Sequence, residues 1–96
     1  MVKILMNKIE SKIKNLILGK LSIFKIEIID DSHKHANHKK DTSGGHFRLF
    51  IVSNHFKGLN LIKRHQLIYE ILKDMIKIEI HALSMKLLDI EEYNQK

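Results

Sequence analysis

The sequence predicts an α+β domain in which helices pack on one face of a three-stranded mixed sheet, in the order α-β-β-α-β-α. Three observations indicate this class. Apolar residues recur at helical spacing in residues 2–18 and again in residues 60–76. Within residues 23–30, apolar Phe24, Ile26 and Ile28 alternate with Lys25 and Glu27, as in a half-buried strand. Residues 47–53 are apolar at nearly every position, which is typical of a central strand covered on both faces.

The first predicted helix, residues 2–18, has one apolar side and one basic side. Lys3, Lys8, Lys12 and Lys14 lie on the other side. The apolar positions lie in a single stripe and are Val2, Leu5, Met6, Ile9, Ile13, Leu16 and Ile17. We therefore expect an amphipathic helix whose stripe packs on the sheet.

A long loop, residues 31–46, joins the predicted strands over 23–30 and 47–53. Two consecutive strands are most simply antiparallel neighbours. A tight turn follows the second strand, in which we expect Phe56 to enter the core and Gly58 to adopt a positive φ.

The second long helix is predicted over residues 60–76, with Asn60 as its N-cap. Lys63 and Arg64 fall off its apolar stripe, which consists of Leu61, Ile62, His65, Ile68, Tyr69, Leu72 and Met75. Residues 78–86 are expected to form a third strand, and a short acidic helix over 90–93 closes the chain. Because a strand, a helix and a strand follow each other, we expect a right-handed crossover and parallel pairing.

Composition limits the function classes. The 96 residues suffice for one domain, and no apolar run approaches the ~20 residues of a membrane span. We expect a soluble, cytoplasmic protein, with an organelle matrix as the alternative, that is monomeric on its own. The net charge is +6, of which the first 25 residues supply +5 from six Lys and one Glu. We interpret this excess mainly as a solvated basic face, since nucleic-acid binding needs charge gathered near a groove-reading element.

The loop over residues 31–46 is the most informative segment for function. It holds four of the chain's seven histidines, His33, His35, His38 and His46. Neutral imidazole is a good ligand for borderline metal ions. The chain has no cysteine, so it has no thiolate of its own to complete a ligand set.

Several motifs in a fixed order resemble those of BolA-like proteins. The strings are DSHKHANH, HF, IVSNHFKGLNLIKRHQLIYEIL and IHALSMK, from about Ile26 to about Glu92. The family shows a D/E-S-x-x-H-A loop, an F-x-G turn, an R-H helix and a closing H-A-L strand. The resemblance implies a class II KH-like fold, which agrees with the order predicted from periodicity.

The resemblance also implies a role in iron–sulfur cluster assembly, transfer or iron sensing. BolA-like proteins pair with monothiol glutaredoxins and share a [2Fe–2S] cluster, to which the glutaredoxin and glutathione supply thiolates. The family's two histidine ligands map onto His81 and onto His35, with His33, His38 and His46 as alternates for the loop ligand. Since His81 has the phase of the apolar Leu83 and Met85, we expect its ring to be partly buried.

Two other functions remain open at this point. A nucleic-acid-binding transcriptional regulator would use the surface of Lys57, Lys63, Arg64 and His65, which is also the expected partner surface. No two glycines have the spacing of the G-x-x-G loop with which KH domains hold RNA, so DNA is the more plausible nucleic acid. Alternatively, the loop histidines bind Zn²⁺ alone. No nucleophile–base pair or phosphate loop stands out, so we do not expect an enzyme.

Overall fold

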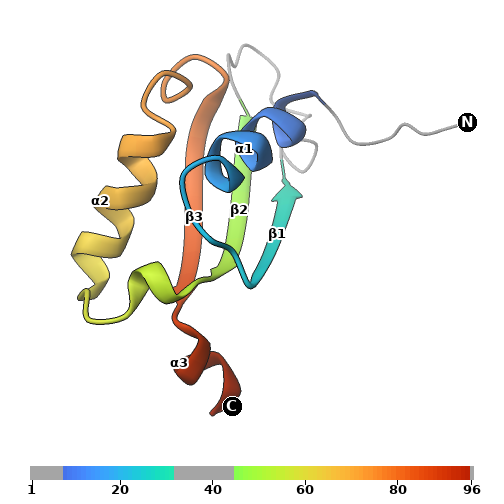
Figure 1. Ribbon diagram of the computed structural model, residues 1–96. Coiled ribbons are helices and arrows are strands. Elements are labelled where there is room, and N and C mark those ends of the chain that lie inside the picture. The colour runs from blue at the N-terminus through green and yellow to red at the C-terminus, as the bar shows by residue number, and fades with distance from the viewer. Residues whose placement is uncertain (1–7, 32–44, 96) are drawn as a thin grey trace, which may run out of the picture.

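The computed structural model describes residues 8–31 and 45–95 and confirms the predicted fold class and element order (Figure 1). The sheet has the order β1-β2-β3, with β1 antiparallel and β3 parallel to β2. No helix in these two ranges is long and apolar enough to cross a bilayer. The elements are α1 Lys8–Leu18, β1 Lys25–Asp30, β2 Gly45–Val52, the 3-10 turn η2 Asn54–Phe56, α2 Leu61–Ile71, β3 Ile80–Leu88 and α3 Ile90–Asn94.

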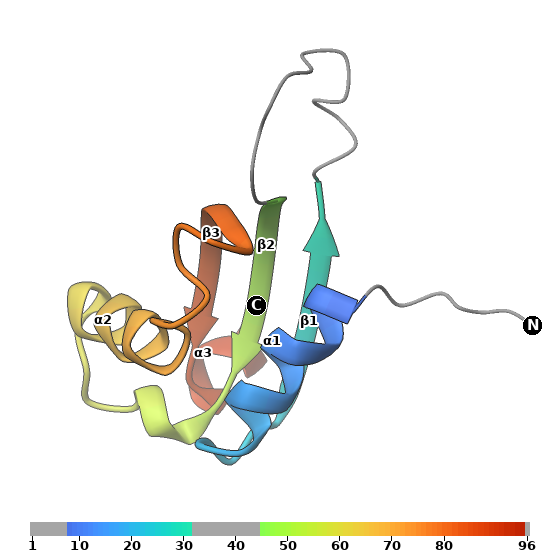
Figure 2. The same cartoon turned by 90° about the horizontal axis from the view of Figure 1, so that it is seen from above.

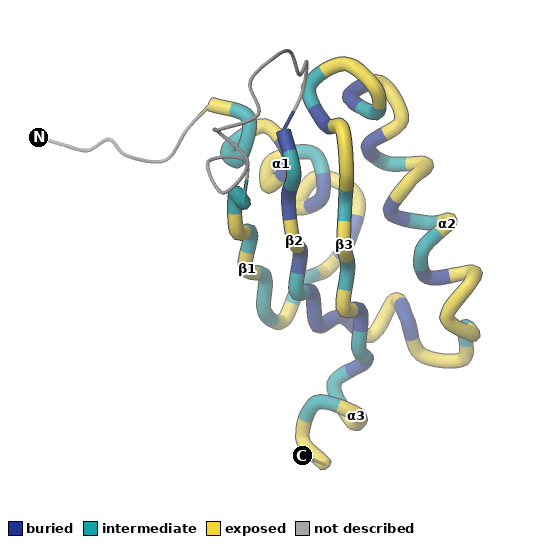
Figure 3. Tube along the Cα trace, turned by 180° about the vertical axis from the view of Figure 1, so that it is seen from behind, coloured by how far each residue is buried: buried dark blue, intermediate teal, exposed yellow. Residues whose placement is uncertain are grey.

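The two longer helices, α1 and α2, lie on the same face of the sheet, and Figure 2 shows them together on one side of the strands. Seen from behind in Figure 3, the opposite face carries neither of them. The prediction that residues 47–53 are covered on both faces is therefore wrong. Phe47, Leu49 and Ile51 point into the core, whereas Arg48 between them is exposed.

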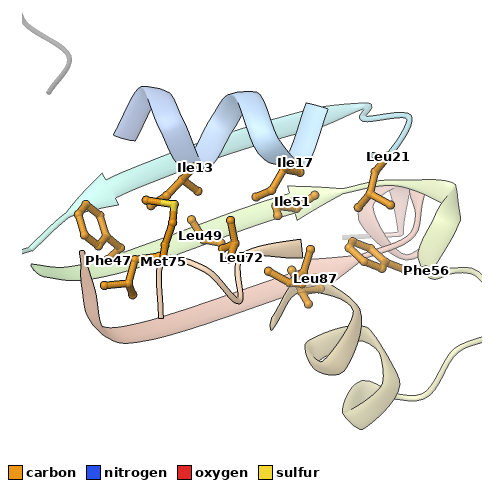
Figure 4. Close-up of a cluster of buried hydrophobic side chains, with 12 residues drawn as sticks. Ile13, Ile17, Leu21, Phe47, Leu49, Ile51, Phe56, Leu72, Met75 and Leu87 are labelled. Carbon is orange, nitrogen blue, oxygen red and sulfur yellow. The ribbon is translucent and has the colours of Figure 1, made fainter. Parts of the chain in front are cut away.

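The core fills the space between the sheet and the two longer helices (Figure 4). The stripe of α1 supplies Ile13 and Ile17, and both are fully buried. Val2, Leu5 and Met6 of the predicted stripe lie outside the described residues. The core cluster contains Ile13, Ile17, Leu21, Phe47, Leu49, Ile51, Phe56, Ile68, Leu72, Met75, Ile80 and Leu87.

The second half of the chain differs from the prediction in its boundaries. Helix α2 ends at Ile71, five residues before the predicted end, and β3 begins at Ile80 instead of residue 78. The connection is a tight turn in which the carbonyl of Met75 accepts the N–H groups of residues 78, 79 and 80. Lys77 has a φ of 75° in this turn. Leu72 and Met75 are buried although they follow the end of the helix. The prediction extended the helix to residue 76 because these two residues continue its apolar spacing.

Helix α2 also presents a different face to the core. Of its predicted stripe, Leu61, Ile62 and Tyr69 are 65%, 68% and 40% exposed, so their predicted burial is wrong. Arg64, predicted on the surface, is only 5% exposed and lies with Ile68 against the sheet. The face of α2 that packs on the sheet is therefore not the face that the apolar residues predict. Arg64 occupies a position on the buried face.

The turn between β2 and α2 follows the sequence closely. Phe56 is fully buried and Gly58 has a φ of 83°, as predicted. The side chain of Asn60 accepts a 2.9 Å hydrogen bond from the backbone N–H of Lys63, which confirms Asn60 as the N-cap of α2.

Candidate functional site

Two histidines, His46 on β2 and His81 on β3, lie side by side at one end of the sheet. Their ring centroids are 5.2 Å apart and the ring planes are inclined by 34°. The ladder pairs Gly45 with Ile80 but His46 with Ala82, so His81 is an extra residue in a bulge of β3. Bulges of this kind re-aim side chains. The strand therefore turns the imidazole of His81 toward its neighbour.

The bulge also explains a wrong prediction about His81. Its ring was expected to be partly buried, in phase with Leu83 and Met85, but the residue is exposed. Leu83 and Met85 do pack against the core. The extra residue breaks the alternation between His81 and these two positions, and it leaves the imidazole accessible to a metal ion or a partner.

A charged pair, Asp31 and Arg48, lies beside His46. The backbone N–H of Asp31 donates a 2.8 Å hydrogen bond to the carbonyl of His46. The Asp31 carboxylate accepts a 2.7 Å bond from Nε of Arg48. A small hollow of about 190 Å³ adjoins these side chains and extends to Ser84 on β3. His46 thus lies between a polar hollow and the ring of His81.

The remaining loop histidines of the prediction, His33, His35 and His38, lie outside the described residues. Residues 8–31 and 45–95 contain no group of three or more His, Asp or Glu side chains that could hold a metal ion. Within these ranges, His46 and His81 are two adjacent imidazoles, and a metal ion bound by both would need further donors. The sequence has no cysteine to supply them as thiolates.

The centroid separation of the pair is compatible with a shared metal ion. A metal–nitrogen bond to histidine is about 2.0–2.1 Å, so two imidazoles on one tetrahedral metal have centroids about 5 Å apart. The observed 5.2 Å agrees with this separation. Imidazole nitrogen also suits iron, copper, nickel and zinc. The donor set therefore fits one half of a mixed imidazole–thiolate centre.

The surface predicted for a partner or a nucleic acid lies along α2 and the turn before it. Lys57 and Lys63 are exposed, and His65 is half-buried. His65 borders an apolar hollow of about 400 Å³ that Leu61 and Tyr69 help to line. Sequence reasoning placed Leu61 and Tyr69 in the core, and so it missed this apolar surface. A partner role for Lys57, Lys63 and His65 stays a prediction.

Arg64 does not belong to that surface, which corrects the prediction. Its Nε donates to the carbonyl of Leu59 at 2.8 Å, and its Nη1 donates to the carbonyl of Leu87 at 3.0 Å. The same Nη1 lies 2.7 Å from Oε1 of Glu92 in the last helix. The hydrogen bond from Arg64, followed by one from the backbone N–H of Asp89, holds the pKa of the Glu92 carboxyl below its ordinary value. Arg64 therefore links α2, β3 and α3 from within.

Comparison with known proteins gives consistent matches. The family model described as BolA-like protein matches residues 17–92. The solved BolA domain of SufE1 from Arabidopsis thaliana is 36% identical and superposes with a TM-score of 0.80, over 92% of this chain and 99% of that domain. Two curated relatives are also similar.

The first, SufE-like protein 1 from Arabidopsis thaliana, is named as chloroplastic/mitochondrial. It is 39% identical over 80 residues, which are 77% of this chain but only 22% of that protein. The second is the DNA-binding transcriptional regulator BolA from Haemophilus influenzae. It is 36% identical over 63 residues, which are 66% of this chain and 61% of that protein. The chain thus spans less than two thirds of the length of either relative.

Proposed function

The chain belongs to the BolA-like protein family, and from this premise we propose that it is an adaptor, not an enzyme, in iron–sulfur cluster handling or iron sensing. It acts with a monothiol glutaredoxin, and the two proteins hold a [2Fe–2S] cluster between them. The observation that supports this proposal is the pair of imidazoles, His46 and His81, 5.2 Å apart at one end of the sheet.

Each partner supplies a different kind of ligand in this proposal. The chain provides His81 and one further imidazole, while the thiolates come from a glutaredoxin cysteine and from glutathione. Neutral imidazoles in place of two thiolates leave a cluster less negative and raise its reduction potential. Because an imidazole must be deprotonated to bind, such a cluster is also released more readily in acid. Both properties suit transfer or sensing better than permanent storage.

The second imidazole comes either from His46 or from the histidines that follow β1. His46 is supported by its position beside His81. His35 is the family's loop position, with His33 and His38 as alternates. His35 is four residues beyond Asp31 in the sequence. The backbone N–H of Asp31 is itself bonded to the carbonyl of His46, so the end of β1 adjoins the site.

The test is reconstitution of the complex. The chain is mixed with a monothiol glutaredoxin, iron, sulfide and glutathione, and visible absorbance and circular dichroism are recorded. We expect His81→Ala to alter both spectra. Of His46→Ala and His35→Ala, the variant that loses more of the cluster absorbance identifies the second ligand. His55→Ala is the matched control, since this exposed histidine follows the opposite end of β2. Unchanged spectra in all three site variants would refute the ligand assignment.

A second candidate function, transcriptional regulation through DNA, has weaker support. The Haemophilus influenzae relative is named a DNA-binding transcriptional regulator. Lys57 and Lys63 would contact phosphates from the surface of α2 and the turn before it. The expected result is duplex binding that weakens steeply as salt rises, and Lys63→Glu should reduce it. Binding no tighter than about 10⁻⁴ to 10⁻⁶ M, the range of non-specific association, would argue against this function.

A further inference from the structure

The sheet face opposite α1 and α2 carries a trough that the proposed function does not use. In Figure 3, which views the molecule from behind, this face is turned toward the viewer and neither α1 nor α2 lies over it. A hollow of about 430 Å³ runs across all three strands, from Ile29 on β1 past Arg48 and Phe50 on β2 to Ser84 and Lys86 on β3. Its volume falls in the range of small-molecule sites, which combine an apolar floor with a few polar groups.

The floor of the trough is apolar and partly aromatic. Ile29 is 43% exposed, and the half-buried ring of Phe50 lies beside it on the same face. The ring of Tyr93 from α3 lies 6.0 Å from Phe50 and 5.9 Å from Phe24, which is 57% exposed. Aromatic rings exposed on an open sheet are surfaces on which a planar ring can stack.

Two cations border this floor. Lys86 is exposed and forms no ion pair with any residue of the described ranges. Among the residues that the structure describes, Arg48 bonds only Asp31, through Nε, which leaves both of its terminal nitrogens available to an anion. Exposed Ser84, which the ladder pairs with Arg48 and which precedes Lys86 by two residues, also lines the trough.

The acidic side chains that the structure describes beside the trough, Glu27 and Asp31, are already paired. Glu27 lies 3.3 Å from Nζ of Lys25, and Asp31 is bonded to Arg48. The unpaired charge of the trough is therefore the ammonium of Lys86, supplemented by the guanidinium edge of Arg48. This arrangement is complementary to an anion that is attached to a flat apolar ring.

We propose that the trough binds a planar aromatic ring that carries an anionic group, the chemistry of a nucleotide, either free or within a single strand. The ring stacks at Phe50, and its phosphate is held between Lys86 and Arg48. The site is separate from the α2 surface that duplex DNA would use. It also does not depend on a metal ion at His46 and His81.

The experiment is an NMR titration of the full chain with two probes, adenosine monophosphate and a short oligothymidylate. We expect backbone shifts at Phe50, Ser84 and Lys86. Lys86→Glu should weaken binding about tenfold, as loss of a charge-assisted hydrogen bond does. Phe50→Leu, which keeps an apolar side chain in a half-buried position, should weaken it at least about fivefold through lost stacking. Circular dichroism verifies that both variants fold.

Lys14→Glu is the matched control, because this exposed lysine belongs to α1, which packs on the other face of the sheet, and it should leave the affinity unchanged. Binding of the monophosphate alone assigns the trough to a free nucleotide, whereas much tighter binding of the oligomer assigns it to a single strand. The proposal is overturned if neither probe binds, if Lys86→Glu binds as well as the unmodified chain, or if the shifts are confined to α2. These results are independent of cluster formation with glutaredoxin.

Discussion

At the scale of single residues, Arg64 shows that a charged side chain can have a structural role inside this small domain. Its guanidinium is nearly buried and bonds two backbone carbonyls, those of Leu59 and Leu87, besides the carboxylate of Glu92. Without the guanidinium, both carbonyls would lose the hydrogen bond that Arg64 donates to them. A charge in this position is tolerated because each of its bonds is directional and charge-assisted.

The substitution Arg64→Met should therefore destabilise the fold although methionine is apolar and of similar length. We expect the free energy of unfolding to fall by about 2–4 kcal/mol, because buried carbonyls lose their donor. Urea denaturation followed by circular dichroism measures the change. The neighbouring Lys63→Met, at an exposed position, should stay within about 0.5 kcal/mol. Equal stability of the two variants would mean that Arg64 contributes no more than a surface residue.

Glu92 makes part of this stability depend on pH. The hydrogen bond from Arg64, and then that from the backbone of Asp89, lowers the pKa of Glu92 in the folded chain. A lowered pKa means that the unfolded chain binds the proton more tightly, so acid favours unfolding. The stabilisation is complete above the ordinary pKa of 4.5 and is lost as the pH falls through the folded value.

We expect the midpoint of urea unfolding to fall as the pH is lowered from neutral to well below 4.5, and to fall less in Glu92→Gln. The variant removes the titrating group, and it keeps one carbonyl oxygen as an acceptor for Arg64. Glu91→Gln, one residue earlier in α3, is the control and should retain the acid sensitivity of the unmodified chain. An identical acid response in Glu92→Gln would show that other carboxylates account for it.

Single residues also show how far sequence reasoning reaches. Phe56, Gly58 and Asn60 were predicted correctly because each position has its own local requirement: a core side chain, a positive φ and an N-cap acceptor. Arg64 and His81 were not, since their surroundings depend on other elements. Arg64 is buried by β3 and α3, and His81 is exposed by a bulge that no local pattern announces.

At the scale of elements, the sequence predicted every helix and strand but misplaced several ends. β2 begins at Gly45, so His46 belongs to the strand and not to the loop in which it was predicted. The prediction extended helix α2 to residue 76 because Leu72 and Met75 continue its apolar spacing, although they pack in the turn that follows. Burial sets the apolar pattern, and an ordered turn buries residues as a helix does. The ends of helices and strands are therefore set by backbone hydrogen bonds, which the pattern of apolar residues does not reveal.

The turn between η2 and α2 relies on Gly58. Its φ of 83° is costly for a residue with a side chain, although no atom lies within 4 Å of an added Cβ. Gly58→Ala should thus cost about 1–2 kcal/mol from the backbone alone, without a clash. Gly58→Asn should cost less, because asparagine tolerates this conformation better. Urea midpoints for the two variants test this order, and an alanine variant as stable as the parent would contradict it.

At the scale of the whole molecule, the two proposed sites and the Arg64–Glu92 network occupy different regions. The His46–His81 pair lies where β2 and β3 begin, and the Arg64–Glu92 network joins α2 to the end of β3 and to α3. The trough occupies the face of the sheet that α1 and α2 leave open. Because α1 and α2 cover only the other face, the core depends on both of them. This division allows a ligand to occupy the open face or the strand ends without displacing a core residue.

Helix α1 tests whether the core is one unit. The family model matches from residue 17, so most of this helix lies before the matched region. Ile13 is nevertheless fully buried against the sheet, whereas Leu18 of the same helix is 45% exposed. Ile13→Ala should lower the free energy of unfolding by about 2–5 kcal/mol through lost burial and a cavity. Leu18→Ala removes a similar volume and should cost less than about 1 kcal/mol. If Ile13→Ala and Leu18→Ala lowered the free energy of unfolding equally, α1 would not be part of the core. A helix that completes the core should be sensitive to changes on its buried face and insensitive to changes on its exposed face.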